Sequence, residues 1–277
     1  MRRIPGRKQT GVMVGLLALV LGGAAAADEP KAAARPYANG ELVRLMVEGR
    51  EAYVVRPSKK VDSSRRWIWV TPGYLELADN RGVVEHQMYA ERFLDAGFHI
   101  VGIDVGATCG SPRGADVYQK FYEHLTTKEK LAKKARMLGQ SNGGLISYAW
   151  AFRHPDLVDR IGAIYPATDF RSWPGLDKAL TYPEPSLRFE LSLDELTRRA
   201  AEWNPIDNLA PLAKAGVKIF HIHGDRDTVV PIEANSKTLV ERYQRLGGSA
   251  KLEIISGLGH GGKAFYSSES LAKFLID

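Results

Sequence analysis

The chain contains almost no cysteine, which limits the ways in which it can be stabilised. Its 277 residues include one cysteine, Cys109, which has no second thiol to form an internal disulfide. The stability of the fold must therefore come from buried apolar surface, and a chain of this length can enclose a large core. Internal repeats and low-complexity blocks are missing as well, so we expect one large domain.

The first 27 residues have the pattern of a secretory signal peptide. Four basic residues precede an apolar run over residues 11–23, and an A-x-A cleavage site ends at Ala27. The apolar run is too short to span a bilayer comfortably. We therefore predict a Sec-type signal cleaved near Ala27, a secreted or periplasmic protein, and no stable membrane insertion after the signal is removed. The adjacent Arg2 and Arg3 leave a twin-arginine route open.

A strong charge of one sign is also missing from the chain that follows this signal. The whole sequence has 38 Lys+Arg and 32 Asp+Glu, and four basic residues lie in the signal, which leaves 34 against 32. The predicted mature protein is close to neutral, so we expect no nucleic acid among its partners.

Apolar strands and amphipathic helices alternate along the chain after a loose leader predicted over residues 28–40. Strands are predicted at residues 42–47, 52–55, 67–70, 99–103, 136–139, 161–165, 217–222 and 252–255. The first two strands flank a turn at Gly49 and should form an antiparallel hairpin. Short apolar strands separated by helices predict a mainly parallel sheet with helices on both faces, forming one α/β domain over residues 41–277.

Helices are expected between several of these strands. Residues 84–96 form an amphipathic pattern closed by Gly97, and residues 145–152 form another helix. Thr126 and Glu129 have the spacing of a capping box, which predicts a helical segment between the strands at 99–103 and 136–139.

Residues 168–205 break the alternation of strands and helices. The segment carries several aromatic side chains and a capping box at Ser192 and Glu195. We predict a small cap-like insert over the site, placed before the next strand of the sheet.

Gly139-Gln140-Ser141-Asn142-Gly143 matches the pattern G-x-S-x-G. In this pattern a serine occupies a strained turn between a strand and a helix, and the flanking glycines admit neighbouring backbone. The predicted strand before Ser141 and the predicted helix after it supply that context. The Asn142 amide would then lie at a helix N-terminus, where it can stabilise an oxyanion.

A serine hydroxyl needs a base and a group that orients the base before it can act as a nucleophile. His260 follows the last predicted strand between glycines, and Asp227 follows the strand at 217–222. The order Ser141, Asp227, His260 is the chain order that α/β-hydrolases use.

These motifs resemble those of the α/β-hydrolase superfamily, and within it the prolyl-oligopeptidase-like and dienelactone-hydrolase-like esterases. That group carries its triad acid in H-G-x-x-D-x-x-V-P and its base in G-H. The matching residues are His223, Gly224, Asp227, Val230, Pro231, Gly259 and His260. The resemblance covers roughly residues 40–277. It implies an α/β-hydrolase fold, a Ser-Asp-His triad and a second oxyanion amide at Tyr74, where the sequence departs from the commoner His-Gly pair.

Other residues compete for some of these roles. Asp169 follows an earlier strand at a position that some members use for the acid, and Asp225 suits a turn. His221 and His223 point the same way on a strand and could bind one metal ion, but the sequence pattern offers no third ligand. We therefore predict neither metal nor cofactor, and ordinary packing for the two histidines.

The predicted function is hydrolysis of a carboxylic ester through an acyl-enzyme, on a small-molecule or polysaccharide ester outside the cytoplasm. Arg113 could pair with a substrate carboxylate, and Trp173 could stack on a sugar face. A prolyl-oligopeptidase-like serine peptidase and a non-catalytic binding protein on the same fold remain the alternatives.

Overall fold

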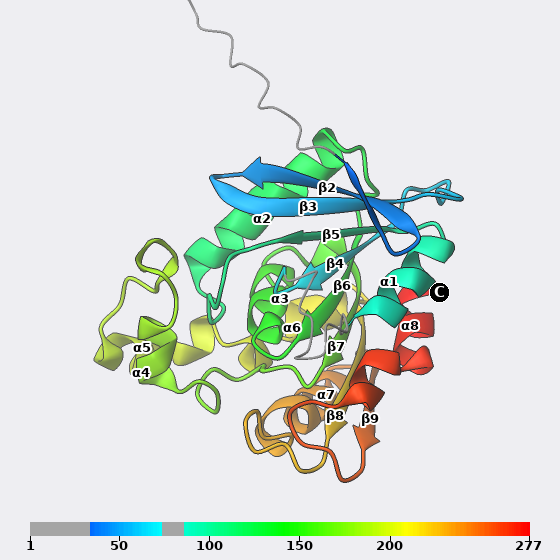
Figure 1. The fold of residues 1–277 in the computed structure, drawn as a ribbon. Coiled ribbons are helices and arrows are strands. Elements are labelled where there is room, and N and C mark those ends of the chain that lie inside the picture. The colour runs from blue at the N-terminus through cyan, green and yellow to red at the C-terminus, as the bar shows by residue number, and fades with distance from the viewer. Residues whose placement is uncertain (1–33, 74–85) are drawn as a thin grey trace, which may run out of the picture. The chain divides into compact units, whose positions relative to one another are not determined.

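The fold was obtained as a computed structural model that describes residues 34–73 and 86–277 (Figure 1). The predicted signal peptide, the first residues of the predicted leader and Tyr74 lie outside the described residues. Within the described ranges, no helix is long and apolar enough to cross a membrane.

The described strands form one nine-stranded sheet in the order β1-β2-β3-β5-β4-β6-β7-β8-β9. Their bounds are β1 (Arg35–Tyr37), β2 (Gly40–Val47), β3 (Arg50–Pro57), β4 (Trp67–Thr71), β5 (His99–Ile103), β6 (Ala135–Gln140), β7 (Val158–Ile164), β8 (Lys218–Gly224) and β9 (Ala250–Ile255). Strands β4 to β9 pair in parallel, and β1 to β3 extend one edge in antiparallel pairing. The predicted mainly parallel sheet of an α/β-hydrolase is confirmed.

Helices cover both faces of this sheet. One face packs against α2 (Pro112–Thr127), α3 (Gly143–Ala151), α6 (Ala210–Lys214) and α7 (Thr238–Arg245). The opposite face packs against α1 (Gln87–Asp95) and α8 (Glu269–Ile276).

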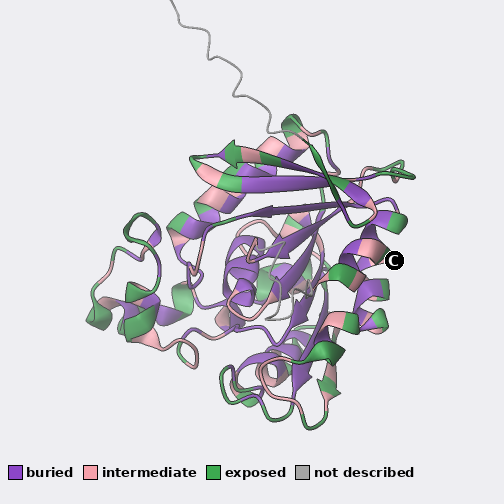
Figure 2. Ribbon diagram, in the orientation of Figure 1, coloured by how far each residue is buried: buried purple, intermediate pink, exposed green. Residues whose placement is uncertain are grey.

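The strand residues alternate between these two helical layers. Trp69 and Met137 face the first layer, and their chain neighbours Ile68 and Leu138 face the second. All four side chains are at most 1% exposed, and the central strands are buried along their length in Figure 2. Burial on both faces explains why these strands are continuous apolar runs rather than alternating patterns.

The β2–β3 hairpin follows directly from its turn sequence. Glu48 and Gly49 form the two-residue loop with φ of +51° and +71°, and Val47 pairs with Arg50 across it. Two positive φ angles are typical of the loop that matches strand twist. The predicted hairpin is therefore confirmed.

Two local predictions were wrong. Residues 35–37 belong to β1, which pairs with β2, so this part of the predicted leader is ordered by backbone hydrogen bonds. The helix predicted between β5 and β6 is present as α2, but it does not begin at Thr126, which lies in its last turn. The helix begins after Ser111, whose hydroxyl accepts a hydrogen bond from the Gly114 amide, with Pro112 in the first helical position.

The segment between β7 and β8 contains α4 (Leu176–Thr181) and α5 (Leu193–Arg199), joined by short 3-10 turns. Its capping box is confirmed, because Ser192 Oγ accepts from the Glu195 amide and the Glu195 carboxylate accepts from the Ser192 amide. The segment forms its own apolar cluster around Phe170, and this cluster includes Leu145 of α3.

Candidate active site

Ser141 occupies the sharp turn between β6 and α3. Its φ is +50°, in the left-handed region that side chains avoid at a cost of roughly 1–2 kcal/mol. Backbone hydrogen bonds hold this conformation: the Ser141 amide donates to the Ile164 carbonyl at 3.0 Å, and the Ala167 amide donates to the Ser141 carbonyl at 2.9 Å. The end of β7 and the residues just after it thus fix the strained turn that the sequence predicted.

The glycines around Ser141 differ in what they allow. A Cβ on Gly143 would lie 2.0 Å from the Thr71 carbonyl oxygen, and one on Gly144 would lie 2.5 Å from the Ala167 carbonyl oxygen. A Cβ on Gly139 would come no closer than 3.3 Å to its nearest neighbour, Ser147 Oγ. The glycines after the serine are therefore required by backbone contact, whereas Gly139 is only tightly surrounded.

The structure brings Ser141, His260 and Asp227 into one continuous series of hydrogen bonds. Ser141 Oγ lies 2.8 Å from His260 Nε2, and His260 Nδ1 lies 2.6 Å from Asp227 Oδ2. With His260 neutral, its Nδ1–H donates to the carboxylate and its Nε2 accepts the Ser141 proton. These three residues come from the ends of β6, β8 and β9, where the carboxyl edges of parallel strands meet.

The Asp227 carboxylate is completely enclosed and well bonded. Its Oδ1 accepts hydrogen bonds from the amides of Val229 and Val230, both at 2.9 Å. The Asp227 side chain is 0% exposed and that of His260 is 18% exposed. Burial therefore decreases from the carboxylate towards the imidazole, which leaves the Ser141 side of the ring accessible.

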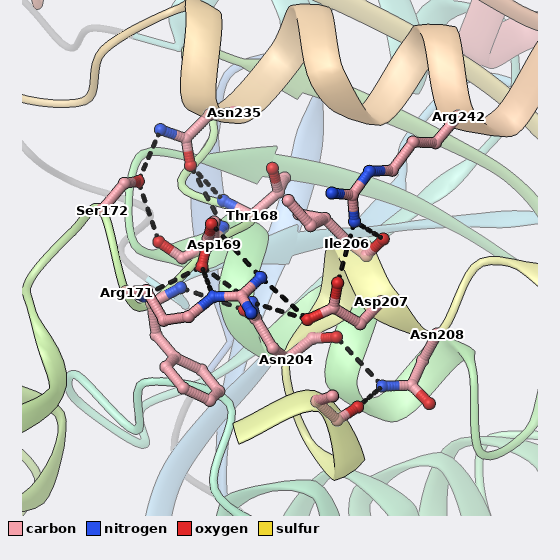
Figure 3. A network of polar contacts seen from close by, with 12 residues as sticks. Thr168, Asp169, Arg171, Ser172, Asn204, Ile206, Asp207, Asn208, Asn235 and Arg242 are labelled. Carbon is pink, nitrogen blue, oxygen red and sulfur yellow. Dashed lines mark hydrogen bonds and ion pairs between the residues drawn. The ribbon is translucent and has the colours of Figure 1, made fainter. Parts of the chain in front are cut away.

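Asp169, the alternative acid, makes contacts away from His260. Its carboxylate accepts from Arg171 at 2.9 Å and from the side-chain amide of Asn204 at 2.7 Å, and Arg171 also pairs with Asp207 at 2.8 Å (Figure 3). Asn235, at the start of the helical stretch leading to α7, accepts from the backbone amides of two residues after β7. This network holds the segment after β7 against that helical stretch.

Asp225 serves a turn, as the sequence suggested. Its carboxylate accepts from the Gly257 amide at 2.6 Å and from the Ser256 hydroxyl at 3.2 Å. The loop that carries Asp227 is thereby joined to the loop that leads to His260.

The Asn142 amide lies beside Ser141 at the N-terminus of α3, where the first amides have no acceptor within the helix. A pocket of about 160 Å³ opens at this point. Its described lining is Val70, Thr71, Pro72, His86, Gln140, Ser141 and Asn142. The predicted position of Asn142 therefore suits an oxyanion.

Sequence reasoning missed a polar cluster that includes two residues lining this pocket, His86 and Gln140. The Tyr165 ring centroid lies 4.3 Å from that of His260, and the Gln140 side-chain amide donates to the Tyr165 hydroxyl at 2.7 Å. Gln140 also accepts from the His86 ring, and the Tyr165 hydroxyl bonds that of Tyr266 at 2.5 Å. The position of Tyr165 directly after β7 was a signal, because ligands in parallel sheets bind at that edge.

Two predicted substrate contacts lie in other surroundings. Arg113 pairs with Glu190 of the segment between β7 and β8, and Trp173 is half-buried against the apolar cluster of that segment. No hydrogen bond, ion pair or ring contact within the described residues links either one to Ser141 or His260.

His221 and His223 are both 0% exposed and are held by hydrogen bonds. Burial, aided by the neighbouring His223, lowers the pKa of His221 to about 3, and burial also lowers the pKa of His223. Among residues 34–73 and 86–277, no group of three or more His, Cys, Asp or Glu side chains could hold a metal ion.

The mainly parallel sheet and the serine turn at the end of β6 define the class: the protein is a serine hydrolase with an α/β-hydrolase fold. A sequence model of the prolyl oligopeptidase family (Peptidase_S9) matches residues 114–276, and the chain belongs to that family. The predicted resemblance is confirmed. A comparison with curated protein sequences finds no match.

Solved structures with the same fold include peptidases and esterases. Dipeptidyl peptidase 4 of Porphyromonas gingivalis is 16% identical with a TM-score of 0.61, over 87% of this chain and 36% of that chain. A puromycin-hydrolyzing peptidase of Mycobacterium tuberculosis is 13% identical with a TM-score of 0.64, over 87% of this chain and 39% of that chain. A truncated carbohydrate esterase from gut microbiota is 18% identical with a TM-score of 0.59, over 82% of this chain and 88% of that chain. The chain thus spans well under half the length of these peptidases.

Proposed function

We propose that the protein hydrolyses carboxylic esters through an acyl-enzyme formed on Ser141. The observation that carries this proposal is the hydrogen-bond series from Ser141 Oγ to His260 Nε2 at 2.8 Å and from His260 Nδ1 to Asp227 at 2.6 Å. A serine held at φ +50° presents its hydroxyl beyond the sheet edge, where an ester carbonyl can approach.

The reaction proceeds in two halves. His260 Nε2 accepts the Ser141 proton as Oγ attacks the carbonyl carbon, and Asp227 stabilises the resulting imidazolium through its buried carboxylate. The imidazolium then protonates the departing alcohol. Water, deprotonated in turn by His260, attacks the acyl-enzyme and releases the acid and free Ser141.

The negative charge on the carbonyl oxygen needs donors that are already in place. The Asn142 amide supplies one donor, supported by the positive end of the α3 dipole. We assign the second donor to the Tyr74 amide, which lies outside the described residues. The proton transfers use this chain's own side chains, and the acyl group passes from the substrate to Ser141 and then to water, so we expect full activity in the presence of a chelator.

The substrate proposal is an ester on a polysaccharide outside the cytoplasm. Export through the predicted signal peptide and the structural similarity to a carbohydrate esterase from gut microbiota support it. In this proposal Trp173 stacks on a sugar face, and Arg113 exchanges its partner Glu190 for a substrate carboxylate.

A serine peptidase is the competing function, because the chain belongs to the prolyl oligopeptidase family and two of the similar structures are peptidases. Peptide hydrolysis would use the same three side chains. The difference lies in the leaving group, an amine in place of an alcohol, which the same imidazolium must protonate.

A paired substrate panel tests the proposal. The full chain is assayed on p-nitrophenyl esters of increasing acyl length, on acetylated and methyl-esterified polysaccharides, and on aminoacyl and prolyl p-nitroanilides, with Ser141→Ala as the control. We expect ester turnover that Ser141→Ala abolishes. Faster turnover of anilides would establish the peptidase, and an unmodified Ser141 after treatment with a fluorophosphonate would point to a binding protein without catalysis.

A further inference from the structure

His223 contacts the same carboxylate oxygen that orients His260. Its Nε2 lies 3.2 Å from Asp227 Oδ2 and 3.0 Å from the carbonyl oxygen of Val230. His260 Nδ1 lies 2.6 Å from the same Oδ2. Two imidazole rings, one buried and one at the cleft, therefore share one oxygen of Asp227.

The protonation of the His223 ring follows from its neighbours. A carbonyl oxygen can only accept, so the His223 Nε2 must carry a proton, which it shares between the Val230 carbonyl oxygen at 3.0 Å and Asp227 Oδ2 at 3.2 Å. Burial lowers the pKa of His223 and keeps the ring neutral, so its Nδ1 has a free lone pair. That Nδ1 lies 2.8 Å from Ser236 Oγ and accepts a hydrogen bond from the Ser236 hydroxyl.

The same reasoning continues one histidine further. Ser236 has only one hydroxyl proton, which it donates to His223, so it must accept from His221 Nδ1 at 3.0 Å. His221, neutral as well, then accepts through Nε2 from the Tyr148 hydroxyl at 2.7 Å. The two histidines of β8 therefore hold opposite tautomers, and every donor in the series points towards Asp227.

The side chains of this series are buried. His221 and Ser236 are 0% exposed, and Tyr148 is 0% exposed in α3, the helix that begins after Ser141. Ser236 lies in a single π-helical turn, residues 233–237, which precedes α7. Such turns are rare and occur frequently at functional sites.

We infer that His223 is a positioning residue for the proposed triad: its Nε2–H, fixed by Ser236, His221 and Tyr148, holds Asp227 Oδ2 in line with His260 Nδ1. The inference rests on the proposed function and extends it from three side chains to a buried series behind Asp227. Without the His223 N–H, Asp227 Oδ2 keeps only the hydrogen bond from His260 Nδ1. The carboxylate is then held less firmly, and it orients the His260 ring less well.

The rate of Ser141 modification by a fluorophosphonate tests the inference without knowledge of the substrate. A hydrogen bond to a charged group is worth about 1.5–3 kcal/mol, so His223→Leu should slow the modification about 10-fold to 100-fold. His223→Gln should recover most of the rate, because its amide can donate to Asp227 and its carbonyl can accept from Ser236. His99→Leu, a replacement of a histidine that is 2% exposed in β5, is the matched control and should react as the wild type does.

A double-mutant comparison separates positioning from general damage to the fold. If His223 acts through Asp227, His223→Leu should cause no further loss when it is added to Asp227→Asn. A general structural defect would instead slow the modification of Ser141 by the same factor in the wild-type chain and in Asp227→Asn. Steady-state kinetics should agree with the labelling rates: in His223→Leu, kcat for an ester should fall while KM changes little.

Three results would overturn the inference: His223→Leu reacting as fast as the wild type, His223→Gln failing to recover the rate while it remains folded, or equal losses in the two backgrounds. If His223→Leu does not fold, Ser236→Ala takes its place, with an expected loss of a few-fold that disappears with Asp227→Asn. A wild-type chain that remains unmodified at Ser141 would instead refute the proposed function.

Discussion

Gly143 and Thr71 meet backbone to backbone: a Cβ on Gly143 would lie 2.0 Å from the Thr71 carbonyl oxygen. This contact holds the first turn of α3, directly after Ser141 and Asn142, against the end of β4. A side chain at residue 143 would have to move one of the two backbones.

Gly143→Ala should therefore lower both stability and activity. We expect a loss of about 3 kcal/mol in the free energy of unfolding, at the upper end for overpacking, and a fall in kcat of about 100-fold, because small misplacements at a reacting centre are costly. Urea denaturation and ester kinetics measure the two effects.

Gly139→Ala is the matched control for this change. Its added Cβ would lie 3.3 Å from Ser147 Oγ, so only a small side-chain adjustment is needed. We expect it to remain within about 1 kcal/mol of the wild type. Equal behaviour of the two variants would mean that the backbone contact does not constrain the turn.

The choice between two acids can be tested by isosteric substitution. Asp227→Asn should lower kcat by about 10⁴, because the amide cannot hold His260 in the tautomer that accepts the Ser141 proton. Asp169→Asn should leave kcat nearly unchanged and cost about 1–3 kcal/mol of stability through its bonds to Arg171 and Asn204. A reversal of these two outcomes would make Asp169 the acid of the triad.

Cys109 should be inert in the folded protein. It is 1% exposed, and burial raises the pKa of its thiol to about 12. We expect no reaction with a disulfide reagent at about pH 8 until denaturant is added, since the thiolate is the reactive form. Cys109→Ala should retain activity, and a native thiol that reacts quickly would show that the loop at residues 106–111 opens.

Stability should fall on mild acidification because His99, His221 and His223 are buried and burial lowers the pKa of each ring. Burial lowers the pKa of His221 to about 3, and burial with nearby Arg65 and Arg56 lowers the pKa of His99 to about 4, from 6.5 when unfolded. Below pH 6.5 the unfolded chain binds protons that the folded chain excludes, so the free energy of unfolding decreases as pH falls towards these values.

Urea denaturation between about pH 7 and pH 4.5, above the range where most carboxylates titrate, measures this decrease. His99→Leu removes one of these buried rings and should make the curve shallower. A free energy of unfolding that stays constant over this range would show that the rings become protonated without unfolding.

Local pattern predicted the parts of the fold that short segments control. The strand at 99–103 was predicted with the bounds of β5, and the hairpin turn at Gly49 follows from two residues. The start of α2 was missed, because Thr126 and Glu129 have capping-box spacing by coincidence, whereas Ser111 and Pro112 carried the actual signal. β1 was missed because three residues give no period, and their order comes from pairing with β2.

The sequence by itself determined Ser141 and His260 and favoured Asp227 as the acid, since G-x-S-x-G and the motifs around Asp227 and His260 each need only a few adjacent residues. It left Asp169 as an alternative acid, because that choice depends on which carboxylate reaches the His260 ring across the sheet edge. Only the tertiary structure shows that a series of hydrogen bonds joins Tyr148, Ser236 and His223 to Asp227. Their relation is a set of donor and acceptor distances between β8, α3 and the turn before α7, and no spacing along the chain encodes such distances.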